Sequence, residues 1–300
     1  MKLTPALDDL QPDAHPMKPL VIAHRGASGL APENTLAAFS LAVALGADGV
    51  ELDVQMSADG RPIVMHDARV NRTTNGTGNV SRLRFEQLQR LDAGAWFDKR
   101  RSRRPRVRAM IDRLYAEAGA ASPHYSGEPV PSLDDVLSLL KPNSLERIYV
   151  ELKGSSLNNA ALLESVLLLV RKHRVVKSTT LLSFDHEVIR RAKELSNEVR
   201  TAALFPARGR RLVSSRLIIR LAESAGVDEV ALHYGLATRR SIDALHERGL
   251  WVSVWTANSK LAIRRVIGAG VDAIMTNFPN RLRELLDSDS ARKSTDWIRR

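Results

Sequence analysis

Polar side chains that can do chemistry close several short apolar stretches of this sequence. They form four groups, which are His24-Arg25-Gly26, Glu51-x-Asp53, His66-Asp67 and Glu151-x-Lys153. Histidines are general acids and bases, carboxylates hold cations, and arginine and lysine bind phosphate or carboxylate groups. Each group alone is a weak signal, because a single histidine or acid after a strand is usually a hydrogen-bonding surface residue. Their shared position at the ends of apolar runs indicates one catalytic site.

The acidic groups predict a cation site. Residues i and i+2 of a strand point to the same face about 7 Å apart, so Glu51 and Asp53 can converge on one ion. An isolated pair of this kind is more often a solvated edge, but these two acids stand inside the apolar run GVELDV, where unpaired charge is costly. Glu151 shares a strand face with Lys153. With no cysteine in the chain, three carboxylates favour Mg²⁺ or Ca²⁺ over zinc.

The elements that must position these groups read as alternating strands and helices. The strand-like runs are residues 19–24, 49–54, 62–66, 147–152, 180–184, 200–205, 228–233, 250–255 and 272–276. Stretches of helical period lie between most of them, at 35–46, 132–140, 158–173, 185–196 and 259–270. This α/β pattern predicts a TIM-type (β/α)8 barrel. Because SADG at 57–60 reads as a turn, either one run is peripheral or the barrel is irregular around strands 2 and 3.

An insertion is predicted at about 98–128, where the rhythm of strands and helices breaks. Residues 99–113 carry eight basic residues and one acidic residue, which is +7 of the chain's net charge of +11. A short helix is expected at 109–119, followed by a loop. A basic flap beside a catalytic site would favour anionic head groups, a lipid surface or a polyanion, and a solvated, partly disordered loop is an equally good interpretation.

The length and composition of the chain limit the class of protein that it can be. A chain of 300 residues with 44% hydrophobic residues and no low-complexity tract is expected to fold into a globular domain. We predict an N-terminal extension at 1–18, a barrel domain at 19–286 and a polar tail at 287–300. Acids and prolines replace the apolar stretch of a signal peptide, and the most apolar helical run, 161–170, is half of a membrane span. A cytoplasmic location is therefore expected.

Seven motifs, in this order and at these spacings, carry a resemblance to a known family: AHRGASGLAPENTLAAF, GADGVELDVQMSADGRPIVMHD, NRTTNGTG, VPSLDDVL, VELK, VSVWTAN and DAIMTNFP. Together they resemble the glycerophosphodiester phosphodiesterase family, from about residue 20 to 286. The resemblance implies a TIM-type barrel that uses a divalent cation to hydrolyse small glycerophosphodiesters to glycerol 3-phosphate and an alcohol. The long, arginine-rich stretch 98–128 departs from the short connection of the family pattern and puts the size of the substrate in doubt.

The resemblance also implies a role for each matching residue. In this assignment His24 and His66 are the acid and base, Glu51, Asp53 and Glu151 hold the metal, and Arg25 and Lys153 contact the phosphate. Glu33 of the PEN motif would lie close to the metal or position Arg25. Trp255 and Phe184 would line the substrate pocket, with a core or rim position as the alternative. His233 and the helix-capping candidates Asn34 and Thr35 are read as structural.

Three functions compete at this stage. The first is hydrolysis of glycerophosphodiesters, in which cationic groups offset the charge of the phosphodiester and two histidines move protons. The second keeps the site but acts on lysophospholipids in the manner of a phospholipase D, with 99–113 touching anionic lipid. The third is a non-catalytic barrel that binds polyanions. Nucleic acid is an unlikely partner for it, because no aromatic residue interleaves 99–113.

Overall fold

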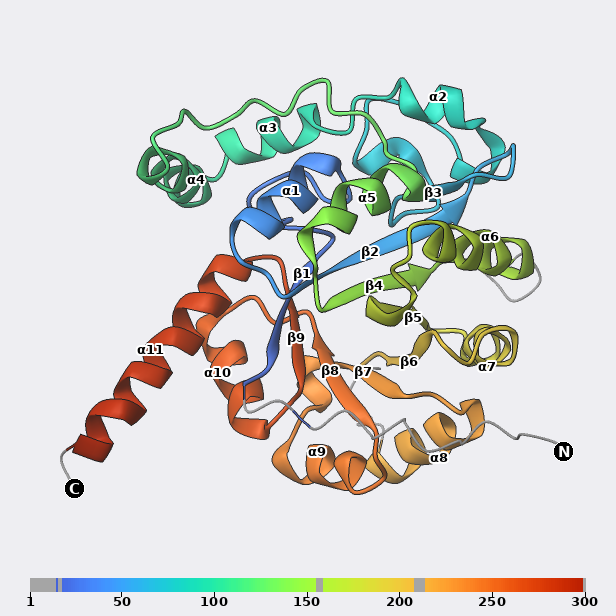
Figure 1. Ribbon diagram of the computed structural model, residues 1–300. Helices are drawn as coiled ribbons and strands as arrows, with labels where there is room; N and C mark the ends of the chain where they lie inside the picture. Colours follow the sequence, from blue (N-terminus) through green and yellow to red (C-terminus); the bar gives the residue numbers. More distant parts are fainter. Residues whose placement is uncertain (1–14, 16–17, 155–158, 208–213, 299–300) are drawn as a thin grey trace, which may run out of the picture.

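Eight parallel strands close into a barrel, with helices covering its outer face (Figure 1). The computed structural model describes residue 15 and residues 18–154, 159–207 and 214–298. The strands of the sheet are β1 (Leu20–His24), β2 (Gly49–Met56), β3 (Pro62–Val64), β4 (Arg147–Leu152), β5 (Thr179–Ser183), β6 (Arg200–Phe205), β7 (Glu229–His233), β8 (Trp251–Trp255) and β9 (Ala273–Thr276). The helices are α1 (Leu36–Ala44), α2 (Phe85–Gln89), α3 (Ala95–Ser102), α4 (Pro105–Glu117), α5 (Leu133–Leu140), α6 (Asn159–Lys172), α7 (His186–Leu195), α8 (Ser215–Ala225), α9 (Arg239–His246), α10 (Lys260–Ala269) and α11 (Pro279–Ile298).

The strand β3 is the peripheral one. It pairs antiparallel with β2 across the turn at 57–60, which is too short for the helix that a parallel connection needs. β2 then continues the barrel by pairing parallel with β1 and β4, and β1 pairs with β9 to close the ring. The predicted TIM-type barrel is therefore confirmed, and the irregularity expected around strands 2 and 3 is this hairpin.

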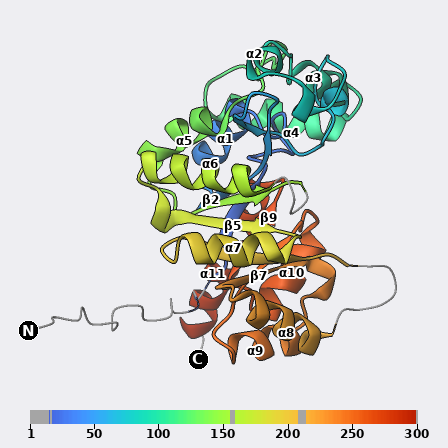
Figure 2. The same ribbon diagram turned by 90° about the vertical axis from the view of Figure 1, so that its right-hand side faces the viewer.

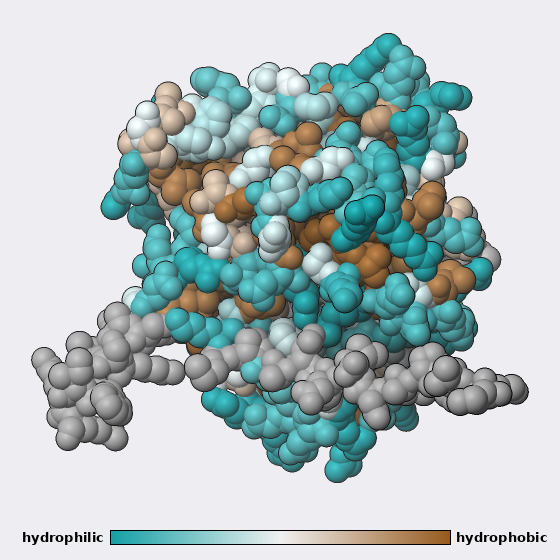
Figure 3. Space-filling view, viewed as in Figure 1, coloured by the Kyte–Doolittle hydropathy of each residue, from teal (hydrophilic) through white to brown (hydrophobic). Residues whose placement is uncertain are grey.

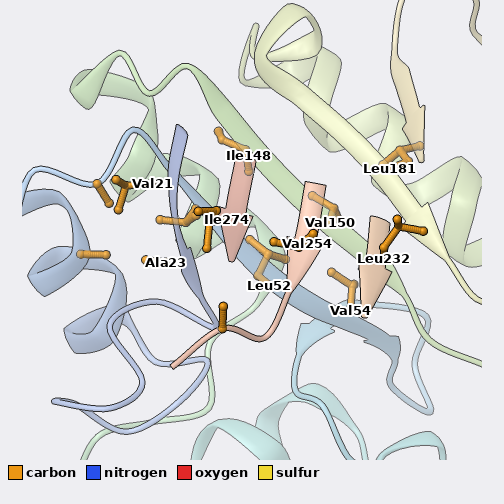
Figure 4. Close-up of a cluster of buried hydrophobic side chains, with 14 of the residues drawn as sticks. Val21, Ala23, Leu52, Val54, Ile148, Val150, Leu181, Leu232, Val254 and Ile274 are labelled. Carbon is orange, nitrogen blue, oxygen red and sulfur yellow. The ribbon is translucent and has the colours of Figure 1, made fainter. Parts of the chain in front are cut away.

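Side chains alternate between the two faces of each barrel strand. Val50, Leu52 and Val54 of β2 point outward and pack in the layer between strands and helices (Figure 4). The alternate positions, Glu51 and Asp53, point inward and are buried. The lower interior is filled by an apolar cluster made of Leu20, Ile22, Tyr149, Leu182, Ala202, Leu204, Ala231, Trp251, Ala273 and Met275. Glu51 and Asp53 therefore stand above this floor, near the carboxyl ends of the strands.

The basic stretch folds as two helices, so its interpretation as a disordered loop is wrong. The helix expected at 109–119 begins earlier, at Pro105, because proline is favoured in the first turn of a helix. The backbone N–H of Ala93 donates to the backbone carbonyl of Glu128 at 2.7 Å and closes the base of the insertion. Above it, the rings of Phe97 and Tyr125 meet edge to face with centroids 5.7 Å apart. Figures 1 and 2 show α2, α3 and α4 at the same end of the molecule, with α3 between the other two in Figure 1.

The outer surface carries mostly hydrophilic residues on the face seen in Figure 3, with apolar groups showing through in its upper half. Of the helices that the structure describes, none is long and apolar enough to cross a membrane. α11 runs from Pro279 to Ile298, and residues 1–14, 16–17 and 299–300 lie outside the described part. The predicted division of the chain at residues 18 and 286 stays a prediction.

Candidate active site

Three buried carboxylates meet at the carboxyl ends of β2 and β4. The register of the two parallel strands places Asp53 beside Glu151, and Glu51 lies one inward position below Asp53. Each of the three residues offers a carboxylate oxygen within 4.8 Å of the other two. The structure thus brings together the acids that the sequence predicts as one cluster.

Two cations and an amide surround the central carboxylate. Lys153 Nζ lies 2.6 Å from Glu151 and 3.0 Å from Asp53, and Arg25 Nε lies 3.2 Å from Asp53. Asn34, which the sequence suggested only as a helix cap, donates from its side chain to Asp53 at 2.8 Å. Thr35 is the residue that caps α1. Burial opposes ionisation of Asp53, but Lys153 and Arg25 outweigh it and hold the pKa of Asp53 well below its usual range.

The other two acids behave in the opposite way. Burial, together with the charge of Asp53, raises the pKa of Glu151 to about 7 and that of Glu51 well above its usual range. In the cation-free protein, the positive charge of Lys153 and Arg25 is too small for all three carboxyl groups to be ionised at the same time. Closely packed oxygen ligands that need one further positive charge are the donor set of a hard divalent cation, so these residues fit such an ion.

The first predicted histidine ends β1. His24 Nδ1 lies 2.8 Å from Asn277 Oδ1, and its Nε2 lies 3.8 Å from Glu51. Since Asn277 Oδ1 can only accept, Nδ1 carries the proton and Nε2 holds the lone pair in the neutral ring. Burial and the charge of Arg25 lower the pKa of His24 to about 4. This imidazole is therefore neutral at pH 7.

The second predicted histidine follows β3 and is more open to solvent. The His66 side chain is 33% exposed, and its Nδ1 lies 2.6 Å from Asp67 Oδ1. Burial lowers the pKa of His66, while the nearby Asp53 acts in the opposite direction. Asp67 is ionised, because hydrogen bonds from Arg72 lower its pKa to about 2. The carboxylate therefore orients the ring and stabilises its protonated form.

Arg72 is a residue that the sequence reasoning missed. It lies in η1 (Val70–Arg72) and donates from Nε to Asp67 at 2.5 Å and from its two Nη atoms to Glu33 at 2.8 and 2.9 Å. Glu33 also accepts a hydrogen bond from Arg25 Nη1 at 2.8 Å. It is therefore placed to position Arg25, which is one of the two roles that the resemblance implies for Glu33. The only signal for Arg72 in the sequence was its place in the NRTTNGTG motif.

Aromatic groups form the opposite side of the barrel mouth. Trp255 ends β8 and donates from Nε1 to the carbonyl of Ala231 at 3.0 Å. Its ring meets Phe184 edge to face with centroids 5.5 Å apart, and Phe184 is 45% exposed. His233 packs on the other edge of Trp255, with centroids 5.6 Å apart. Phe184 and Trp255 are thus rim residues with exposed aromatic surface beside the site.

The turn after β1 aims Arg25 into the site. Arg25 and Gly26 both take left-handed backbone angles, with φ of 57° and 74°. A Cβ added to Gly26 would lie 2.6 Å from the backbone carbonyl carbon of Ala38, so no other residue fits there without a shift. The backbone N–H of Arg25 then donates to Glu51 at 3.0 Å, which ties the turn to the acidic cluster.

A cavity of about 260 Å³ opens beside His24. Its wall combines residues of the site with residues of the insertion and of the loops after β8 and β9. The charged or titratable residues of this wall are His24, Arg25, Glu33, Arg100, Arg101 and Arg104. The insertion therefore borders the candidate site at His24 and Arg25.

Comparison with known proteins identifies the family. Residues 24–281 match the profile of the glycerophosphoryl diester phosphodiesterase family. The chain belongs to this family. A glycerophosphodiester phosphodiesterase of Caldanaerobacter subterraneus is 30% identical over 272 residues, which is 90% of this chain and 98% of that protein. The family and the enzyme class predicted from the sequence are thereby confirmed.

Solved structures of the family agree in fold. A phosphodiesterase of Oleispira antarctica, solved in complex with the product sn-glycerol-3-phosphate, has 25% identity and a TM-score of 0.75, with 90% of this chain and 97% of that chain covered. A glycerophosphodiester phosphodiesterase of Agrobacterium tumefaciens has 30% identity and a TM-score of 0.67, with 87% and 97% covered. The barrel seen here is therefore the barrel of the phosphodiesterase family.

Proposed function

We propose that the chain hydrolyses glycerophosphodiesters to glycerol 3-phosphate and an alcohol, with a divalent cation and two histidines. The observation that carries the proposal is the buried carboxylate cluster with cationic side chains around it and an imidazole on either side. The named product of the Oleispira relative, sn-glycerol-3-phosphate, supports the same substrate class. Small glycerophosphodiesters such as glycerophosphocholine are the expected substrates.

Glu51, Asp53 and Glu151 would hold the cation, Mg²⁺ or Ca²⁺, because their oxygens converge in a dry pocket. When bound, this ion would offset the negative charge of the phosphodiester and of the transition state. Arg25 and Lys153 would contact the phosphate, since both cations lie beside Asp53 and are more exposed than it is. The main task of these groups is to reduce the electrostatic repulsion between the negatively charged diester and the attacking nucleophile.

The two histidines divide the proton transfers. His24 is neutral at pH 7 with its lone pair on Nε2, so it would accept the proton of the attacking hydroxyl, from water or from the neighbouring glycerol hydroxyl. His66 is held by Asp67, whose carboxylate stabilises the imidazolium once it has formed, so a protonated His66 would protonate the leaving alkoxide. Trp255 and Phe184 would bind the organic part of the substrate on the rim.

The decisive experiment measures glycerol 3-phosphate released from glycerophosphocholine with Mg²⁺, with Ca²⁺ and with excess chelator. Product is expected with a cation and none is expected in chelator. Full activity in excess chelator contradicts the role of the cation, and no product from several diesters contradicts the substrate class. Lysophospholipids belong in the same panel, because release of their alcohol by this site would favour the lipid substrate instead.

A further inference from the structure

Two arginines of the insertion face the active-site cavity without a carboxylate partner. In the part of the chain that the structure describes, no Asp or Glu oxygen lies within 4.0 Å of Arg100 or Arg104. Their neighbour Arg101 is different, because it is buried, lies 3.4 Å from Asp98 and donates to the carbonyl of Pro123 at 2.9 Å. Arg101 is thus part of the scaffold, whereas the charges of Arg100 and Arg104 are available to a ligand.

The two arginines share one electrostatic environment. Burial, followed by the charge of Arg104, lowers the pKa of Arg100. Arg100 lies over the ring of Trp96, 5.9 Å from its centroid. An anion bound by both guanidinium groups would offset the repulsion between them. Glu33 also lines the cavity, but it already accepts hydrogen bonds from Arg25 and Arg72.

The helices that carry these arginines form a firm support. Asp98 accepts from the backbone N–H groups of Tyr125 and Ser126 at 2.8 and 3.1 Å, which ties α3 to the returning loop. Gly94 packs so closely that an added Cβ would lie 1.5 Å from the carbonyl oxygen of Tyr125. Ile111 of α4 is fully buried against the core. A charged pair on such a support is positioned before a ligand arrives.

We propose that Arg100 and Arg104 form an anion subsite that binds a second negative group, carried on the alcohol part of the diester substrate. The inference rests on the proposed function and names its substrate class. His24 and the two arginines line one cavity, and Trp255 and Phe184, which contact each other, are not among its lining residues. A phosphodiester has two organic arms, so one meets the aromatic rim and the other meets the arginines. The arm that meets the arginines therefore carries an anionic substituent such as a phosphate.

The test compares two diesters that differ by one phosphate, glycerophosphoinositol and glycerophosphoinositol 4-phosphate. The wild-type enzyme is expected to prefer the phosphorylated diester by about tenfold in kcat/KM, as two exposed ion pairs would give. The preference should shrink as ionic strength rises, because exposed charges are screened. In R100Q/R104Q the ratio of the two kcat/KM values is expected to fall to about one.

The matched control is R106Q/R108Q, which removes the same charge from exposed positions of α4 that do not line the cavity. This variant should keep the wild-type ratio. Equal ratios in the wild type and both variants would overturn the subsite. Loss of binding to anionic vesicles in R100Q/R104Q, with an unchanged substrate ratio, would also overturn it and favour a lipid surface. If the wild type hydrolyses neither these diesters nor glycerophosphocholine, the proposed function itself fails, and the subsite fails with it.

Discussion

At the scale of single residues, the site is defined by unequal protonation of similar groups. Asp53 stays ionised because Lys153 and Arg25 are paired with it, whereas Glu51 and Glu151 keep their protons more strongly than free carboxyl groups. The same chemical group therefore stands in two states within one cluster. A cation that binds here must displace protons from the two glutamates, so its affinity depends on pH.

Substituting a ligand acid tests this cluster. Glu51→Gln and Glu151→Gln each replace a carboxylate by a neutral amide of the same shape, so cation affinity and kcat/KM are expected to fall by about a hundredfold or more. Cation binding can be followed by calorimetry and turnover by release of glycerol 3-phosphate. Glu86→Gln is the control, since Glu86 is exposed on α2 and pairs only with Arg90. Unchanged cation affinity in both cluster variants would remove these acids from the metal site.

Substituting the exposed histidine separates proton transfer from cation binding. His66→Ala is expected to lose about 10²- to 10⁴-fold in kcat, as loss of a general acid does, while cation affinity stays within the wild-type range. Asp67→Asn keeps the ring but removes the carboxylate that orients it, so it should show a smaller loss and a shifted pH profile. A near-normal rate in His66→Ala would show that another group protonates the leaving alkoxide.

At the scale of elements, strand alternation explains which parts of the site could be predicted from the sequence. Acids at i and i+2 of β2 must share a face, so Glu51 and Asp53 were accessible from spacing alone, and the parallel order of β2 and β4 brings Glu151 beside them. Arg72 and Asn277 were not accessible. Their contacts depend on how loops fold over the barrel mouth, which no periodic pattern encodes.

The insertion is a second region whose structure the sequence pattern predicts only in part. The sequence predicted only the helix at 109–119, which is part of α4, because the charge of the eight basic residues hides the weak apolar pattern of α3 and of the start of α4. Tertiary contacts settle the outcome, as Phe97, Ile111 and Tyr125 become buried together. The residue-level roles, the cation, the lipid contact of 99–113 and the cytoplasmic location remain predictions from the sequence.

The β1–α1 turn offers a test at the element scale. Gly26→Ala forces a side chain onto the backbone of Ala38 at positive φ, so the free energy of unfolding is expected to fall by about 3 kcal/mol. Gly60→Ala is the matched control, because Gly60 has a similar φ of 76° with no atom within 4 Å of the added Cβ, and it should cost only about 1 kcal/mol. Urea denaturation measures both. Equal losses in the two variants would show that the close contact with Ala38 is unimportant.

At the scale of the whole molecule, the acidic cluster links stability to pH. Glu151 has a pKa of about 7 when folded and an ordinary value of 4.5, so the folded state holds more protons than the unfolded state between these values. In the cation-free protein, the stability that Glu151 contributes is therefore lost as pH rises from about 4.5 to 7. A bound divalent cation takes the place of those protons, so its stabilising effect must grow over the same window.

Thermal unfolding with and without cation checks this linkage. Mg²⁺ or Ca²⁺ at a hundred times its Kd at pH 8 is expected to add about 2.7 kcal/mol at that pH, or about 4 °C in Tm for a chain of 300 residues. The same cation concentration should add much less at pH 5. Glu151→Gln removes one titrating acid, so the loss of stability with rising pH should become shallower in the cation-free variant. A Tm gain that is equal at pH 5 and pH 8 would contradict proton displacement by the cation.

The hydrogen bond between His24 and Asn277 has a consequence for the protein during its synthesis. These residues are 253 positions apart, one at the end of the first strand and the other just after the last. During translation the acids and His24 are complete long before the residue that orients the His24 ring exists. A growing chain therefore carries the proposed metal ligands but not the oriented His24 ring. If His24 is the base, as proposed, phosphodiester cleavage can begin only when the last strand has been synthesised and has joined the first.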